Sequence, residues 1–88
     1  MTQRVLKVHQ ADNVIVALTD LKKDEIIEYA GDTIVLQEDV QAKHKFTSIP
    51  LNTGDEVIMY GVLVGRAQED LNKGSLLTTT NIKHAASA

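Results

Sequence analysis

The sequence predicts an all-β domain made of short strands, and two features of the chain support this. Its apolar segments are short and rich in Val and Ile, as residues 14–18 and 57–60 illustrate, and this pattern favours strands over helices. Clusters of Gly, Asn and Asp separate these segments, at roughly the 8 to 12 residue spacing typical of small β domains. The 88-residue chain has the length of one domain, so we expect a single domain over residues 1–88.

Turn-forming clusters mark the ends of the strands, because each cluster contains residues that accept a left-handed backbone or bond to their own backbone. These clusters are residues 11–13, 30–32, 52–55 and 72–74. Segments 37–43 and 78–81 lack a strand pattern. We expect a turn or one short helical coil in the first and a capped half-turn in the second, so that the domain contains one or two short helical turns. The predicted strands are residues 5–9, 14–18, 33–36, 45–49, 57–60, 63–67, 75–77 and 82–84.

One turn pattern recurs in the chain. Residues 21–26, 51–57 and 71–76 share the form Leu-x-x-(Gly/Asp), and each leads into an apolar strand. Gly54 and Gly74 would hold the left-handed position, with Asp24 as a tolerated substitute. The spacing between the copies varies, so the pattern indicates a reused turn rather than a solenoid repeat.

Alternation predicts the core, because every second side chain of a strand points to the same face. The chain has only two Tyr and one Phe, so the core must be aliphatic. Residues 14–18 and 57–64 are apolar at almost every position, so we also expect docking or self-association through a strand face. The expected single core consists of Val5, Val14, Val16, Leu18, Ile34, Leu36, Val57, Met59, Leu63 and Leu76.

Composition excludes several function classes. Nine Lys and Arg against twelve Asp and Glu give a net charge of -3, which argues against nucleic acid as a partner. The absence of Cys excludes a disulfide scaffold, a zinc ribbon, an iron–sulfur site and a thiol nucleophile. The run at residues 14–18 is far shorter than the ~20 apolar residues that span a bilayer, and residues 1–4 do not resemble a signal peptide. We therefore expect a cytoplasmic protein without a membrane partner.

Four ordered segments carry a resemblance to a known family. Residues 7–9, 12–18, 44–46 and 54–65 resemble the small N-terminal SAF-type domain of altronate and galactarate dehydratases. The resemblance extends from about residue 7 to about residue 83, the expected domain core. Family members usually carry Gly before the His-Lys pair, where this chain has Lys43.

The resemblance implies a fold, an activity and a partner. The fold would be a β-clip, and the chain would be the small subunit or N-terminal domain of a metal-dependent sugar-acid dehydratase. Such an enzyme eliminates water to give a 2-keto-3-deoxy sugar acid, usually with ferrous iron as its divalent metal. A large dehydratase subunit or domain would supply most of the catalysis, so the 88 residues alone would be inactive. The alternative is a SAF-type carbohydrate-binding or interaction module without catalysis.

His44 and Lys45 are the candidate catalytic residues. An imidazole can abstract a proton beside a carboxylate near neutral pH, and a neighbouring ammonium can hold that carboxylate. Adjacent residues of a strand point to opposite faces, so only one of the two can enter a given site. A purely structural role for the pair stays open.

A second cluster lies near the N-terminus. Asp12 and Asn13 are candidate substrate-binding residues, and His9 is a candidate metal ligand together with Asp12. The simpler interpretation is an Asx turn between two strands. The three histidines lie far apart in the sequence, so no pair with metal-ligand spacing supports the metal site.

Overall fold

The computed structural model describes residues 4–84, and this part of the chain folds into strands, turns and bends without a helix. The all-β prediction is therefore confirmed. The described residues accordingly offer no apolar helix that could cross a membrane. In chain order the strands are β1 (Val5–Leu6), β2 (Val14–Ala17), β3 (Ile26–Tyr29), β4 (Asp32–Val35), β5 (Lys45–Thr47), β6 (Glu56–Met59), β7 (Val62–Ala67) and β8 (Ile82–His84).

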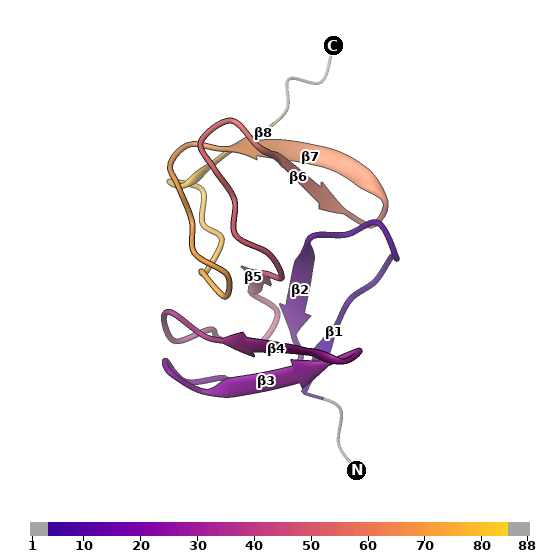
Figure 1. The fold of residues 1–88 in the computed structure, drawn as a ribbon, viewed down its shortest axis with the longest axis vertical. Coiled ribbons are helices and arrows are strands. Elements are labelled where there is room, and N and C mark those ends of the chain that lie inside the picture. The colour runs from indigo at the N-terminus through magenta and orange to yellow at the C-terminus, as the bar shows by residue number, and fades with distance from the viewer. Residues whose placement is uncertain (1–3, 85–88) are drawn as a thin grey trace.

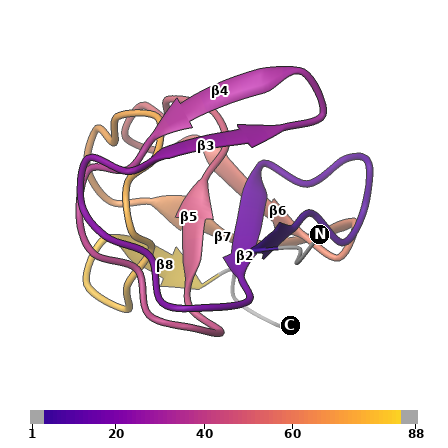
Figure 2. The same ribbon diagram turned by 90° about the horizontal axis from the view of Figure 1, so that it is seen from below.

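The strands form three small antiparallel sheets. Their orders are β1-β2-β5, β3-β4 and β6-β7-β8. The β3-β4 hairpin lies at one end of the molecule, the β6-β7-β8 sheet lies at the other, and β2 and β5 run between them (Figure 1). Viewed from below, the hairpin runs across the ends of β2 and β5 (Figure 2). The central strands therefore contact both ends of the fold.

Two local predictions are wrong. The strand expected at residues 75–77 is reduced to one bridge between Phe46 and Leu76, because the turn at Gly74 brings this segment alongside β5 for only a short stretch. The helical turns expected at residues 37–43 and 78–81 are absent, and both segments form the bends and turns that were the other expectation. Val40 instead forms a bridge with Leu21, and a turn follows it at residues 42–43.

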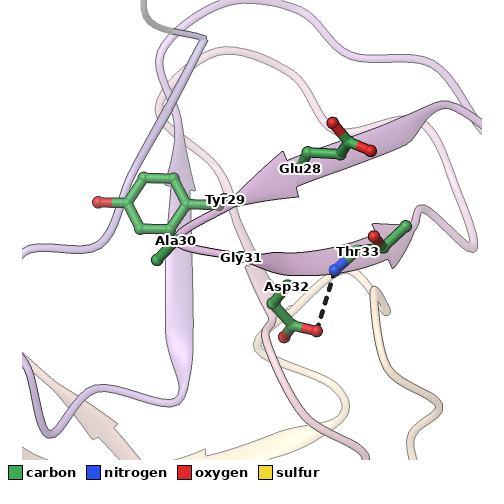
Figure 3. A pocket seen from close by; sticks show the side chains of 6 residues that line it. All are labelled: Glu28, Tyr29, Ala30, Gly31, Asp32 and Thr33. Atoms are coloured by element: carbon green, nitrogen blue, oxygen red, sulfur yellow. Dashed lines mark hydrogen bonds between the residues drawn. The ribbon is translucent and has the colours of Figure 1, made fainter.

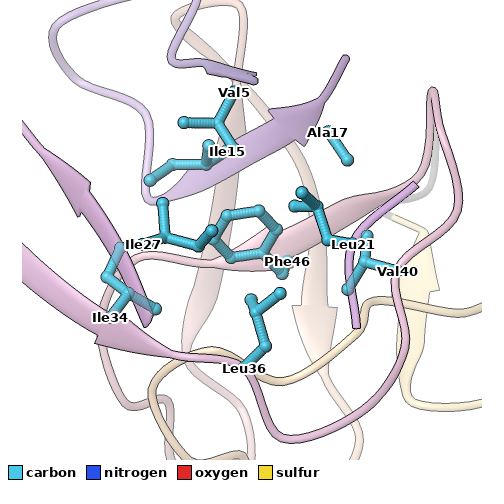
Figure 4. Close-up of a cluster of buried hydrophobic side chains, with 9 residues drawn as sticks. All are labelled: Val5, Ile15, Ala17, Leu21, Ile27, Ile34, Leu36, Val40 and Phe46. Atoms are coloured by element: carbon cyan, nitrogen blue, oxygen red, sulfur yellow. The ribbon is translucent and has the colours of Figure 1, made fainter. Parts of the chain in front are cut away.

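The hydrophobic residues form two clusters, so the prediction of a single core is wrong. β2 lies between them, because Ile15 and Ala17 point into the first cluster and Val14 points into the second. Phe46 is fully buried in the first cluster, beside Ile27 of the hairpin (Figure 4). The first cluster contains Val5, Ile15, Ala17, Leu21, Ile27, Ile34, Leu36, Val40 and Phe46. The second contains Val14, Leu51, Val57, Ala67, Leu71 and Ile82.

Part of the expected core is exposed or only half-buried. Leu18 keeps 46% of its surface exposed and Leu63 keeps 36%. Leu18 follows the last residue of β2, and Leu63 lies in β7, whereas Ala17 and Val57 are buried. The half-buried members of the expected set are Val16, Met59 and Leu76.

Residues 14–46 and residues 44–77, here called the two halves of the fold, repeat one set of backbone contacts. Leu21 and Val40 exchange two hydrogen bonds, with N···O distances of 2.7 and 2.9 Å. Leu51 and Leu71 exchange the same pair of bonds at 2.9 and 2.7 Å. Each pair joins two turns of the Leu-x-x-Gly type, and the turn at residues 40–43 is a copy that the sequence analysis missed. The positive-φ residues of these turns are Asp24, Lys43, Gly54 and Gly74.

The same repeat relates β2 to β5. The N–H of Lys43 donates to the carbonyl of Ala17, the last residue of β2, at 2.7 Å. The N–H of Gly74 donates to the carbonyl of Thr47, the last residue of β5, at 3.0 Å. Residues 14–46 and residues 44–77 are therefore two versions of one arrangement, with β5 shared between them.

Candidate functional site

His44 and Lys45 lie where the turn after Val40 enters β5. The backbone fixes this position, because the His44 N–H donates to the Gln41 carbonyl at 3.0 Å and the His44 carbonyl accepts from Ala17 at 2.8 Å. The His44 side chain is exposed and the Lys45 side chain is half-buried. As adjacent residues they point to opposite faces of the chain. A catalytic role for either residue stays a prediction.

Lys45 lines a cavity of about 150 Å³, here called the Lys45 hollow. Its other polar lining residue is Thr78, whose hydroxyl oxygen accepts hydrogen bonds from the N–H groups of Thr80 and Asn81, both at 3.2 Å. Within residues 4–84 the Lys45 ammonium has neither a hydrogen-bond nor an ion-pair partner. The apolar lining residues are Val57, Met59, Val64, Leu77 and Ile82.

Asn13 joins the first half of the fold to the second. Its side-chain Nδ2 donates to the Glu56 carbonyl at 2.8 Å, and its Oδ1 accepts from the Ile58 N–H at 2.8 Å. The register of β6 and β7 shifts between Val57 and Ile58, so the amide bonds to β6 at a β-bulge. These contacts give Asn13 a structural role, and substrate binding by Asn13 stays a prediction.

Asp12 also joins the first half of the fold to the second, and only 4% of its surface is exposed. Its Oδ1 accepts from the Gly61 N–H at 2.8 Å and its Oδ2 accepts from the His9 N–H at 3.0 Å. Burial raises the pKa of the Asp12 carboxyl, but the backbone bonds from Gly61, His9 and Tyr60 outweigh it. The pKa therefore lies below its ordinary value of 3.8, and the carboxylate is ionised at neutral pH.

His9 packs its ring against the turn between β6 and β7. A Cβ added to Gly61 would lie 3.0 Å from the ring. The Nδ1 atom accepts a hydrogen bond from the Ala11 N–H at 3.0 Å, which leaves Nε2 for other contacts. Both Asp12 oxygens already accept backbone hydrogen bonds, and residues 4–84 contain no group of three or more acidic or His side chains that could hold a metal. Metal binding by His9 stays a prediction.

The hairpin of β3 and β4 carries two hollows that no pattern in the sequence predicted. One of about 300 Å³ surrounds the hairpin end from Glu28 to Thr33 (Figure 3). Glu28 and Asp32 point to opposite sides of the hairpin (Figure 3), so their carboxylates do not converge on one ligand. The Ala30-Gly31 pair was the feature of the sequence that could have indicated this hairpin. These two residues, with φ angles of 52° and 82°, form the two-residue turn that closes it.

The second of these cavities, here called the Ile15 hollow, has a volume of about 190 Å³ and is lined by Lys7, Ile15, Tyr29, Asp32 and their neighbours. The Tyr29 hydroxyl accepts a hydrogen bond from the Lys7 N–H at 3.2 Å. The ammonium of Lys73 donates to Asp32 at 2.6 Å. This bond, with a smaller contribution from the charge of Lys7, lowers the pKa of Asp32.

A family comparison accounts for nearly the whole chain. Residues 3–85 match the altronate/galactarate dehydratase SAF domain. The chain belongs to this family. The resemblance seen in the sequence motifs is thereby confirmed, and the fold described above is that of a SAF domain.

Two curated relatives show how much of a dehydratase this SAF domain represents. The chain is 31% identical over 78 residues to the altronate dehydratase of Bacillus subtilis (strain 168). The aligned region covers 89% of this chain and 16% of that protein. It is 38% identical over 69 residues to the altronate dehydratase of Escherichia coli (strain K12), which covers 78% of this chain and 14% of that protein. The SAF domain thus spans only a small fraction of these relatives.

Proposed function

We propose that this chain is the small SAF component of an altronate-type sugar-acid dehydratase and acts with a large dehydratase component, either as a separate subunit or as a domain of one protein. One observation carries the proposal: both relatives are named altronate dehydratase, and the matching part is 16% and 14% of their length. The remainder of such an enzyme must lie in residues beyond the SAF domain. We propose elimination of water from a sugar acid, giving a 2-keto-3-deoxy sugar acid.

The chemistry of water elimination supports a division of labour. Removing a proton beside a carboxylate requires a base, an acid for the departing hydroxyl, and an electrophile that stabilises the enediolate. Among residues 4–84, the polar atoms around Asp12 and Asn13 accept or donate hydrogen bonds within the fold. We therefore assign the divalent metal of the complete enzyme, with Fe²⁺ as the expected ion, to the large component.

His44 is the residue that we propose to act on the substrate from the small component. Its side chain is exposed at the turn before β5, while its backbone is fixed by bonds to Gln41 and Ala17. A fixed backbone with a free imidazole is suited to entering the active site of a partner as an acid, a base or a metal-facing ligand. Lys45 points to the other face. There we propose that its ammonium contacts a carboxylate, either of the substrate or of the large component.

The partnership is tested by mixing the purified chain with the large dehydratase chain of the same organism and measuring mass by light scattering after size-exclusion chromatography. We expect one complex whose mass is the sum of its components. His44→Gln should leave this mass unchanged, because the exposed ring does not support the fold. Separate elution of the two chains at tens of micromolar would overturn the proposal.

A carbohydrate-binding module without catalysis is the second candidate function. The observation that favours it is the Ile15 hollow, whose lining combines the Tyr29 ring with the charged side chains of Lys7 and Asp32. Calorimetric titration of the isolated chain with altronate and with neutral sugars separates the two functions. Binding that Tyr29→Ala abolishes would favour the module, and no binding in the millimolar range is expected for the dehydratase component.

A further inference from the structure

The repeat in the fold makes Lys45 the counterpart of Ile15. Both residues lie two positions before the strand ends that bond to the turns, Ala17 in β2 and Thr47 in β5. Ile15 pairs with Phe46, and the Lys45 carbonyl correspondingly accepts from the Leu77 N–H at 2.9 Å. Ile15 is 2% exposed, so an apolar side chain satisfies this position in the first half. The fold alone does not require a lysine there.

The two halves also differ in the charge around this position. In the Ile15 hollow the cation of Lys7 shares the lining with the carboxylate of Asp32. The lining of the Lys45 hollow contains no carboxylate. The Lys45 ammonium therefore lies at the edge of an apolar cavity without a negative partner from residues 4–84.

The size and lining of the Lys45 hollow indicate its occupant. A volume of about 150 Å³ is below the roughly 300–1,000 Å³ of ordinary small-molecule sites, and it suits a single apolar side chain. A sugar acid would bury several hydroxyls against Val57, Met59 and Leu77, and each unpaired hydroxyl would cost free energy. Interface anchors, in contrast, are typically apolar side chains inserted into such pockets.

We propose that the Lys45 hollow is the docking site for a segment of the large dehydratase component that presents an apolar side chain next to an Asp or Glu. The apolar side chain fills the space between Val57, Met59 and Ile82, and the carboxylate pairs with the Lys45 ammonium. This inference rests on the proposed function, since the occupant comes from the part of the enzyme that the SAF domain lacks. The net charge of -3 makes a second copy of this chain a less favourable occupant.

The test measures the affinity of the chain for the separately expressed large component by calorimetry, with three variants. Lys45→Gln removes the charge, and Lys45→Ile introduces the residue of the first half. Lys83→Gln removes a charge from the exposed residue next to Ile82 on β8 and is the matched control. We expect both Lys45 variants to raise Kd at least about tenfold, as expected for loss of a desolvated charge pair, and Lys83→Gln to stay within about twofold.

Stability measurements separate docking from folding. Lys45→Ile should unfold at or above the wild-type temperature, because the buried Ile15 shows that the repeated arrangement accommodates isoleucine. Rising salt should weaken binding of the wild type more than binding of Lys45→Ile.

Several outcomes would overturn the proposal. If the wild-type chain does not bind the large component, the proposed function fails and this site fails with it. If the wild type binds and both Lys45 variants bind equally well, only the docking site is wrong. Loss of a homodimer on Lys45→Ile would identify a second copy as the occupant, and competition by millimolar altronate would identify a substrate site.

Discussion

Gly74 approaches Val35 so closely that an added Cβ would lie 2.2 Å from the Val35 carbonyl oxygen. The contact joins the halves of the repeat, because Gly74 belongs to the turn after Leu71 and Val35 ends β4. The Gln37 N–H donates to the Gly74 carbonyl at 3.1 Å beside it. A glycine is therefore required here for two reasons, its φ of +89° and the lack of space.

Gly74→Ala should consequently destabilise the fold more than Gly54→Ala. Both glycines have φ +89°, but a Cβ on Gly54 meets nothing within 4 Å. We expect Gly54→Ala to cost about 1–2 kcal/mol from the left-handed conformation alone. Gly74→Ala should cost clearly more, because a backbone oxygen must move. Equal denaturation midpoints in urea would contradict this.

Lys43→Gly should stabilise the protein. Lys43 has φ 74°, a conformation that costs a non-glycine residue roughly 1–2 kcal/mol, whereas the extra freedom of glycine in the unfolded chain offsets about 0.5–1 kcal/mol. We expect a net gain of up to about 1 kcal/mol. The control is Gln41→Gly, two residues earlier in the same turn and without positive φ, which should not stabilise. A melting temperature of Lys43→Gly below that of the wild type would show that the positive φ of Lys43 does not strain the fold.

Lys43 also explains why the sequence revealed only part of the repeat. The turns at Asp24, Gly54 and Gly74 carry residues that signal a left-handed backbone, and they were predicted. The fourth turn carries a lysine in that position and begins at Val40 rather than Leu, so residues 37–43 suggested a helical turn instead. β3 was missed for a related reason, since only Ile27 of its four residues is buried.

The sequence indicated which residues could form the candidate site. It did not indicate how these residues are arranged in space. Alternation predicts that His44 and Lys45 point to opposite faces, and the structure leaves His44 exposed and Lys45 half-buried. Nothing in the sequence indicated that Asn13 would bond to Glu56 and Ile58, more than 40 residues away, because such contacts depend on how the halves pack. The two clusters likewise follow from the position of β2 between two sheets, which alternation in a single strand does not determine.

Asp12→Asn should destabilise the junction between the halves. The substituted amide can accept from only one of the two N–H groups that Asp12 now binds, those of Gly61 and His9, and its NH2 group would face the other donor. The expected loss is about 1–3 kcal/mol. Glu38→Gln removes an exposed carboxylate and serves as the control, with an expected change within about 0.5 kcal/mol. Unchanged stability of Asp12→Asn would contradict the structural role.

The same carboxylate makes stability depend on acid. Because the pKa of Asp12 is lower in the folded state than its ordinary 3.8, its contribution is complete above about pH 5. It is lost as the pH falls through the folded value. The free energy of unfolding should therefore decrease below about pH 4, and less steeply in Asp12→Asn. Glu25, Asp32 and Asp70 also have lowered pKa values, so some slope should remain. Identical slopes for both proteins would exclude Asp12 as a contributor.

His44→Gln should lower the catalytic rate of the reconstituted enzyme without weakening assembly. An imidazole that transfers a proton typically contributes about 10²- to 10⁴-fold in rate, and the exposed side chain makes no contact that the fold needs. The measurement is kcat/KM with altronate beside the Kd for the large component. A change of kcat/KM within about twofold would make His44 structural.

The rate of altronate dehydration tests the proposed division of labour between the SAF component and a large dehydratase component. The rate is measured for the chain alone, for the large component alone and for the mixture, in the presence of ferrous iron. We expect no measurable turnover by the chain alone and a marked rise in rate when the chain is added to the large component. Turnover by the purified 88-residue chain, or a large component whose rate is unaffected by the chain, would contradict it.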